Sequence, residues 1–250
     1  MVTTKMTLLN FESIESYEML VQFLKEQATQ HDWLFHFTRI ECLLAILETK
    51  KWKLSKLKSM NDLHELQKSA AESQNTPSAT CFSFGDEDNF AMWERYAVPT
   101  ENGIRIAIPI NNFSTITLNA SIYLSDIVYY QGYTRAPLDH EPFFPKRLLW
   151  SNKEIKYFED WTDQQDNLAG VIKNSAWKHE DETRLICTDG NTEIDLPDSF
   201  FENWIVSYGP GVNDQNNFLR LIREKYPNIN INQSYFISRD SGKRVYSPRT

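Results

Sequence analysis

The chain has 250 residues, of which 41% are hydrophobic and 13% aromatic, a composition that supports a sizeable core and excludes a disordered or fibrous protein. Its formal net charge of -8 argues against an extensive nucleic-acid-binding surface, because binding to the phosphate backbone depends on Lys and Arg. No stretch approaches the roughly 20 apolar residues of a membrane-spanning helix, and the first residues lack the apolar segment of a secretory signal. We therefore expect a cytoplasmic protein with no membrane association.

The length fits one domain. We expect a single domain over residues 1–250, with an N-terminal helical segment at 1–30 and a core at 31–240. The cysteines Cys42, Cys81 and Cys187 are odd in number, widely spaced and each set in an apolar run. This pattern predicts buried thiols in a reducing compartment, not a disulfide framework or a zinc site, and no other spacing predicts a bound metal.

The first elements place a histidine next to a helix start. Residues 13–28 carry apolar side chains every three or four positions, which predicts an amphipathic helix, and the aromatic run 33–37 predicts a short strand. Thr38 is followed three residues later by Glu41, the pattern of a capping box, so we expect a helix whose N-cap is Thr38. His36 is then expected at the end of a strand, two residues before the cap.

The rest of the chain reads as short strands and helices in clusters. Up to residue 130 we expect a strand at 52–55, a helix opening within 59–65 and capped by Asn61 or Asp62, a strand at 79–84, a helix at 90–97, and strands at 103–110 and 121–130. Beyond it we expect helices at 148–158 and 165–175, a strand at 182–187, a hairpin turn at 188–192, a strand at 204–209, a helix at 214–225 and a last strand at Ser234–Ser238. Because strands and helices do not alternate regularly, the pattern favours an α+β fold over a doubly wound sheet.

One charged run, W-K-H-E-D-E-T-R at 177–184, stands out. If it is extended, its period of two places Glu180, Glu182 and Arg184 on one face. These residues could form a solvated edge with ion pairs, or the wall of a cleft. No phosphate-binding loop, dinucleotide fingerprint, nucleophile elbow or zinc-protease motif accompanies them, which leaves polar residues at element ends as the candidate chemistry.

The chain resembles the domain-of-unknown-function 2971 family of bacterial proteins. The similar pieces are H-F-T-R-I-E-C-L-L-A-I-L, M-N-D-L-H-E, C-F-S-F followed by M-W-E-R-Y, W-K-H-E-D-E-T-R, and a late strand ending in Y-G-P-G. Together they cover roughly residues 33–240 in order. One departure is Phe37, where the family usually has tyrosine. The family name itself implies no chemistry.

A second resemblance does imply chemistry. A strand ending in H-F-T, followed directly by a helix, is similar to the opening of the ADP-ribosyltransferase superfamily, which implies a split mixed or antiparallel β core flanked by short helices. In that superfamily the strand-end histidine bonds the ribose of NAD, an aromatic ring stacks on nicotinamide, and a late glutamate holds the ribose 2′-hydroxyl. The resemblance therefore implies the ribose role for His36, the stacking role for Tyr96, the ribosyl-cation role for Glu182 and an acceptor-facing role for Glu180.

Further NAD contacts follow from the same resemblance. Arg39, beside the expected helix start at Thr38, could hold the pyrophosphate. Asn61 and Asp62 would contribute if their helix cap faces the His36 cleft, and Arg184 would orient Glu182. Each also has a plainer interpretation, since Asn and Asp commonly cap helices, and Trp93 and Tyr96 share a helix face that could simply pack in the core.

These residues predict an NAD-consuming enzyme. It would transfer ADP-ribose to an unknown macromolecular acceptor, or hydrolyse NAD, and the superfamily resemblance implies a toxin or phage-defence setting. A carboxylate beside the reacting ribose would stabilise the oxocarbenium-like charge that cleavage of the glycosidic bond creates. Two alternatives stay open: a non-catalytic nucleotide- or peptide-binding module, and an enzyme acting on RNA ends or phosphates.

Overall fold

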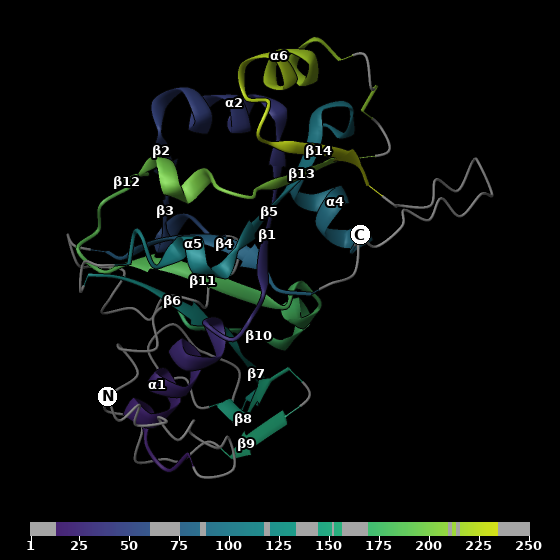
Figure 1. Ribbon diagram of the computed structural model, residues 1–250. Helices are drawn as coiled ribbons and strands as arrows, with labels where there is room; N and C mark the ends of the chain where they lie inside the picture. The colour runs from purple at the N-terminus through teal and green to yellow at the C-terminus, as the bar shows by residue number, and fades with distance from the viewer. Residues whose placement is uncertain are drawn as a thin grey trace. The chain divides into compact units, whose positions relative to one another are not determined.

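The computed structural model of the chain describes residues 14–60, 76–85, 89–117, 121–133, 145–151, 153–156, 170–209, 212–213 and 216–234 (Figure 1). Over these residues the protein has an α+β fold of mainly antiparallel strands with a few helices, as the sequence predicts. The described residues fall into two compact units, each built from separate segments of the chain, and each is described by itself.

Unit 1 takes the described residues within Met1–His31, Leu54–Cys81 and Asn119–Thr192. Its helices are α1 (Tyr17–Ala28) and the 3₁₀ turns η2 (Leu57–Ser59) and η5 (Ser175–Glu180). Its strands are β3 (Ser55–Lys56), most of β4 (Ser78–Ser83), β6 (Ile122–Asp126), β7 (Val128–Tyr133), β8 (Pro145–Trp150), β9 (Lys153–Lys156), β10 (Ile172–Asn174) and β11 (Glu182–Cys187).

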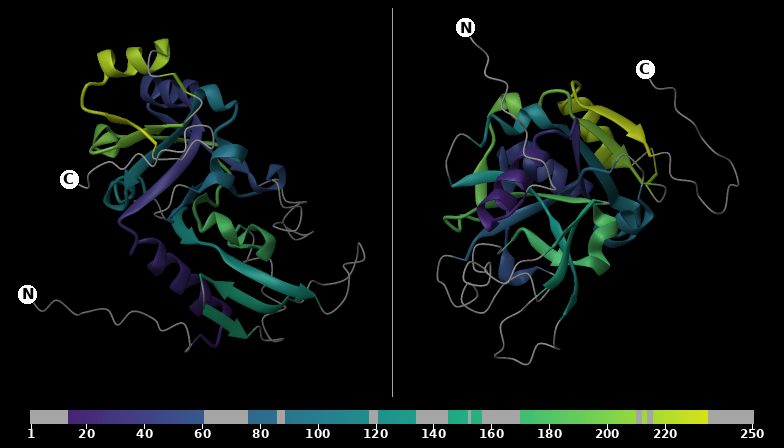
Figure 2. Two further views of the ribbon diagram at one scale, coloured as in Figure 1. Left: turned by 90° about the vertical axis from the view of Figure 1, so that its right-hand side faces the viewer. Right: turned by 90° about the horizontal axis from the view of Figure 1, so that it is seen from below.

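Strand β11 has a neighbouring strand on each side in unit 1. It pairs antiparallel with β6, where Thr183 lies opposite Asp126, and its other neighbour is β4, which also pairs with β3. A second sheet has the order β10-β7-β8-β9 among the described strands, with β10 parallel to β7 and the other pairs antiparallel. Figure 2 shows β7 and β8 side by side in its left view.

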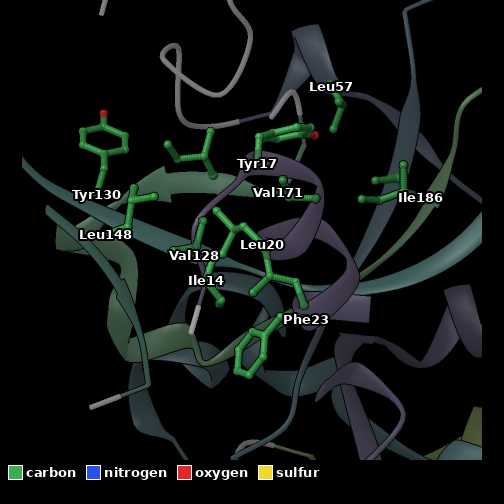
Figure 3. Close-up of a cluster of buried hydrophobic side chains, with 13 residues drawn as sticks. Ile14, Tyr17, Leu20, Phe23, Leu57, Val128, Tyr130, Leu148, Val171 and Ile186 are labelled. Carbon is green, nitrogen blue, oxygen red and sulfur yellow. The ribbon is translucent and has the colours of Figure 1, made fainter. Parts of the chain in front are cut away.

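Helix α1 closes one side of this unit. Ser16 caps it by accepting a hydrogen bond from the Met19 backbone N–H at 3.2 Å, and the helix packs on β6. Tyr17, Leu20 and Leu24 recur at helical spacing and are buried, in a cluster that also contains apolar side chains of β7, β8 and β11 (Figure 3). Each fully buried side chain of this size stabilises the unit by about 1.5 to 3 kcal/mol.

Unit 2 takes the described residues within Asp32–Lys53, Phe82–Leu118 and Glu193–Thr250. Its helices are α2 (Ile40–Thr49), α4 (Phe90–Tyr96), α5 (Ile110–Phe113) and α6 (Asn217–Lys225), with 3₁₀ turns η3 (Thr100–Asn102) and η6 (Asp198–Phe201). Its strands are β1 (Trp33–Arg39), β2 (Lys51–Lys53), β5 (Gly103–Pro109), β12 (Glu193–Asp195), β13 (Ile205–Tyr208) and β14 (Asn230–Gln233).

Strand β5 lies between β1 and β13 in unit 2, and β14 follows β13 in parallel. Helices α2 and α6 lie side by side in Figures 1 and 2. The core is aromatic: Trp52 contacts Phe82, Phe200 and Trp204 at centroid distances of 5.6, 6.2 and 6.1 Å. Such edge and tilted contacts add to the apolar area that the rings bury.

The capping box predicted at Thr38 is wrong. Strand β1 continues to Arg39, because residues His36 to Arg39 keep pairing with Ile106 to Gly103 of β5. Arg39 is the N-cap of α2 and makes no side-chain cap bond, while the Glu41 carboxylate accepts a hydrogen bond from Asn102 at 2.6 Å. His36 therefore lies within the strand and not at its end.

Four further expectations are corrected in unit 1. The helix at 148–158 is replaced by β8 and β9 over its described part, because Leu148 is buried against α1 and β7 in an extended pairing. The described part of the expected helix at 165–175 includes β10, which pairs with β7. The turn at 188–192 does not close a hairpin, since β12 pairs with β2 instead of β11. The expected strand at 121–130 is divided at Ile127 into β6 and β7.

The last described strand is β14, and of the strand expected at Ser234–Ser238, residues 235–238 lie outside the described part. All three cysteines are free thiols, with Cys187 buried and the other two half-buried. Over the described ranges, no helix has both the length and the apolar character needed to cross a membrane.

Candidate functional site

Strand β11 is buried on both faces, although it carries three polar side chains. All six of its residues are buried, and Glu182 and Arg184 point to the face opposite that of Thr183. A buried strand is normally apolar, because an unpaired buried charge costs several kcal/mol. Each polar side chain on β11 must therefore have partners, and these partners define two clusters.

The first is a cluster of four buried charged side chains, which we call the charge cluster: Lys173, Glu180, Glu182 and Arg184. The Lys173 ammonium lies 2.5 Å from the Glu180 carboxylate and 2.9 Å from that of Glu182. Arg184 donates to Glu182 through Nε at 2.6 Å and through a terminal nitrogen at 3.2 Å, and to the Gly170 carbonyl at 3.1 Å. The exposed fractions of the four residues are 4%, 2%, 2% and 0%.

Within the charge cluster the pKa shifts favour the charged forms. Burial acts to raise the pKa of Glu182, but the positive charges of Arg184 and Lys173 outweigh it and lower the pKa to about 2. Burial acts to lower the pKa of Lys173, but the carboxylates of Glu182 and Glu180 outweigh it and raise the pKa. The two cations and two carboxylates cancel in formal charge, so the cluster is a closed ionic unit.

The second cluster lies on the other face of β11 and joins a histidine to a buried aspartate. His31 Nε2 lies 2.9 and 3.0 Å from the two carboxylate oxygens of Asp126. The same carboxylate accepts hydrogen bonds from Thr183 Oγ1 at 2.6 Å and Trp150 Nε1 at 3.0 Å. Because an ionised carboxylate only accepts hydrogen bonds, Nε2 carries the proton in this arrangement.

The exposure of this pair is typical of a histidine oriented by a carboxylate. The Asp126 side chain is 0% exposed and that of His31 is 16% exposed. The aspartate is fixed from three sides, and the histidine that it holds still reaches the surface. A buried carboxylate that fixes one ring nitrogen of a histidine sets its tautomer and ring orientation for acid–base chemistry at the other nitrogen.

A further acidic residue, Asp181, lies between the end of η5 and the start of β11. It lies between Glu180 and Glu182, and its backbone has the left-handed values φ 41° and ψ 64°. Burial raises the pKa of its carboxyl, the charges of Lys178, His179 and His31 lower it, and that of Asp126 raises it.

Of the residues predicted as catalytic or orienting, the structure brings Glu180, Glu182 and Arg184 together. They are not a solvated edge, since all three are buried and their charges are paired. Glu180 ends η5 instead of lying in the strand, and the single-strand alternation expected for the run is wrong at that residue. Both carboxylate oxygens of Glu182 are already bonded to cations, which leaves it poorly placed to stabilise a substrate cation.

In unit 2, β1 separates two of the predicted NAD contacts. The His36 ring lies 5.1 Å from the Trp52 ring and 5.6 Å from the Phe82 ring. Tyr96 packs with the cluster that contains Phe37 and Phe35, whose side chains point to the other face of the strand. The two rings therefore do not face one ligand across the same side of β1.

The other predicted contacts are placed as follows. Thr38 is half-buried near the end of β1, and the exposed Arg39 has a terminal nitrogen 3.9 Å from the sulfur of Cys42. Asn61 and Asp62 lie outside the described residues. His36 belongs to unit 2 and Glu182 to unit 1, so their convergence on one pocket stays a prediction.

Unit 2 contains a cavity of about 520 Å³ beside the ends of α2 and α6. Its lining residues are Leu47, Lys50, Asp198, Phe201, Glu202, Asn203, Lys225, Tyr226, Pro227, Asn228 and Ile229. Lys50 is paired with Asp198 at 2.6 Å, and both are exposed. The volume is within the range of small-molecule sites, and the lining mixes apolar rings with amides and charges.

The sequence interpretation missed His31, Asp126 and Asp181. A signal for Asp126 was present, because it is the one acidic residue in the apolar run S-I-Y-L-S-D-I-V-Y-Y, and such a residue needs buried partners. Over the described ranges, no group of three or more His, Cys, Asp or Glu side chains is arranged to hold a metal ion.

Comparisons with known proteins add no relative to this description. A scan against protein-family models, a search of curated proteins and a search of solved structures each return no match. The resemblances to the domain-of-unknown-function 2971 family and to ADP-ribosyltransferases stay predictions from the residues quoted above.

Proposed function

We propose that the protein is an NAD-consuming enzyme in which His31, oriented by Asp126, is the acid–base group. The observation that carries the proposal is the contact of His31 Nε2 with both oxygens of a fully buried carboxylate. A positioned histidine is the commonest general acid or base in enzymes, and holding its tautomer is the usual role of such a carboxylate.

The choice of NAD rests on the sequence resemblance, and the chemistry of the second cluster suits it. When the bond between nicotinamide and ribose breaks, neutral nicotinamide leaves with the bonding electrons and positive charge develops on the ribose. Water, or a nucleophile on a macromolecular acceptor, then bonds to the ribose carbon and loses its proton. His31, which Asp126 orients through Nε2, would take that proton.

Within this proposal we assign the cation-stabilising carboxylate to Asp181 instead of Glu182. Glu182 is 2% exposed and bonded to both Lys173 and Arg184, so its charge is already compensated. Asp181 is partly exposed; burial raises the pKa of its carboxyl, and the charge of His31 is among those that lower it. Glycosyl transfer needs one carboxylate near the developing charge and one base near the attacking nucleophile, and Asp181 and His31 would supply them.

An ADP-ribosyltransferase-like fold is part of the same proposal. The α+β architecture of mainly antiparallel strands supports it, as does the H-F-T stretch on β1 followed directly by α2. A cytoplasmic site of action and a toxin or phage-defence role are proposals on the resemblance alone.

The test is nicotinamide release from labelled NAD, with the protein alone and with fractions of a cell lysate. Replacing His31 by Gln should lower the rate by a factor on the order of 100 to 10,000, because an amide cannot exchange the proton. Asp126→Asn should also lower it, while Asp195→Asn, at an exposed position of β12, serves as a control. Release by none of the preparations would remove the class, and an unchanged rate in His31→Gln would remove the role of His31.

The cavity in unit 2 favours a second candidate, a non-catalytic module that binds a nucleotide or a peptide. Its volume of about 520 Å³ suits either ligand. A rise in melting temperature with NAD or a peptide, lost in Tyr226→Ala and without nicotinamide release, would support binding in place of catalysis.

A further inference from the structure

One lysine ties together the two residues that flank Asp181. Lys173 Nζ lies 2.5 Å from Glu180 Oε2 and 2.9 Å from Glu182 Oε2. Its ammonium is also 5.0 Å from the centre of the Trp177 ring, and the lysine is 4% exposed. The side chains of Glu180 and Glu182 therefore point into the same buried cluster, whereas Asp181, which lies between them, is not part of it.

Glu182 is fixed at more than its carboxylate. Its backbone N–H donates to the buried Tyr129 hydroxyl at 3.0 Å, and Arg184 holds the carboxylate from the other side. Glu180 is held at its side chain by Lys173, at the end of η5. The chain on both sides of Asp181 is therefore anchored inside unit 1.

The backbone of Asp181 shows the consequence of this anchoring. Its φ of 41° lies in the left-handed region, which costs a non-glycine residue about 1 to 2 kcal/mol. Asp181 also caps the end of η5, since its backbone N–H donates a hydrogen bond to the Lys178 carbonyl at 3.2 Å. Glycine would fit this backbone without strain, yet the chain has a carboxylate here.

We propose that Lys173 is a positioning residue: by holding Glu180 and Glu182 in one buried cluster, it fixes the left-handed backbone of Asp181 and so keeps the Asp181 carboxyl half-buried. Only the catalytic consequence of this inference rests on the proposed function. The placement of Asp181 is a property of the fold and can be tested without any substrate.

The direct test follows the titration of the Asp181 carboxyl by carbon-13 NMR in the wild type and in Lys173→Gln, Lys173→Arg and Glu180→Gln. Burial raises the pKa of this carboxyl in the wild type, and the nearby charges that act on it are those of Lys178, Asp126, His179 and His31. Loss of the contacts of Lys173 with Glu180 and Glu182 should let the Asp181 side chain move into solvent. The pKa of Asp181 should therefore fall back toward its ordinary value in Lys173→Gln.

The other variants make the result decisive. Lys173→Arg keeps the cation and should keep the wild-type titration. Glu180→Gln removes the ion pair of Lys173 with Glu180 and leaves the pair of Lys173 with Glu182, so it should fold even if Lys173→Gln does not. The pKa of Asp181 in this variant should shift in the same direction by a smaller amount. A wild-type titration in folded Glu180→Gln and Lys173→Gln, or in Glu180→Gln alone if the lysine variant is unfolded, would overturn the inference.

Measuring nicotinamide release gives a second test. If the proposed function holds, Lys173→Gln should lower kcat for nicotinamide release by a factor on the order of 100, with KM little changed, and Lys173→Arg should restore most of it. Lys51→Gln removes an exposed ion pair with Glu193 and is the matched control. A shifted Asp181 titration in a protein that never releases nicotinamide would keep the clamp and remove the proposed function, whereas an unshifted titration in an active enzyme would do the reverse.

Discussion

His31 Nε2 and the Asp126 carboxylate lie 2.9 Å apart although 95 positions separate the two residues in the chain. Strand β6 pairs with β11 in a register that sets Asp126 opposite Thr183, whose hydroxyl donates to the same carboxylate. The Asp126 side chain is 0% exposed and that of His31 is 16% exposed.

The first prediction concerns the stability that this pair contributes. Asp126→Ala should lower the free energy of unfolding by about 1 to 3 kcal/mol for each buried donor left unsatisfied, since Thr183 and Trp150 lose their acceptor. Urea denaturation followed by tryptophan fluorescence measures the loss. Asp195→Ala, on an exposed position of β12, should change the free energy by no more than about 0.5 kcal/mol. Equal effects of the two substitutions would contradict the buried network.

A second prediction separates stability from function at Asp181. Asp181→Gly should leave the melting temperature unchanged or raise it, because glycine adopts φ 41° without strain. Nicotinamide release should nevertheless be lost, because the carboxylate is gone. Thermal melting and the release assay on the same preparation check both statements. A marked fall in melting temperature would mean that the Asp181 side chain, and not its backbone, matters for folding.

The third prediction compares a buried carboxylate with an exposed one. Glu182→Gln should destabilise the protein by about 3 to 5 kcal/mol, because Lys173 and Arg184 would keep buried charges with too few anions. Glu193→Gln breaks a pair whose side chains are each 46% exposed, and should cost about 0 to 1 kcal/mol. Chemical denaturation of both variants gives the comparison, and similar losses would show that the charge cluster is not closed to water.

The fourth prediction is a pH dependence from the same residue. The pKa of Glu182 is lowered from 4.5 to about 2, so the native state favours its ionised form. Its contribution to stability is therefore fully present above about pH 4.5 and is lost as the pH falls toward 2. The wild type should lose stability across this window more steeply than Glu182→Gln, which has no proton to bind there. Parallel slopes in the two proteins would contradict this assignment.

The sequence predicted strands that consist largely of apolar residues, such as β5 and β13. Such strands are recognisable because most of their residues are buried. It failed at β8 and β9, where L-L-W-S-N-K-E-I-K-Y-F satisfies a helical period as well as an extended one. The choice there is made by pairing with β7, a contact that no local pattern contains. The same holds for Thr38, where pairing with Ile104 overrides a capping signal.

The candidate site was predictable only in part. The run at 177–184 correctly drew attention to Glu180, Glu182 and Arg184, and their shared cluster follows. Local alternation could not show that Lys173, on another strand, would draw both glutamates inward and leave Asp181 outside. His31 gave no local signal at all, because its partner Asp126 lies 95 positions away in the chain.

The catalytic role of the Asp181 carboxylate can be measured as nicotinamide release by Asp181→Asn, compared with the wild type at equal concentrations of folded protein. Asparagine tolerates the left-handed backbone and has nearly the same shape, so only the charge is removed. The account predicts a rate lower by a factor on the order of 100 or more, with an unchanged rate in the Glu193→Gln control. Wild-type release by Asp181→Asn would contradict the assignment of the cation-stabilising role to Asp181.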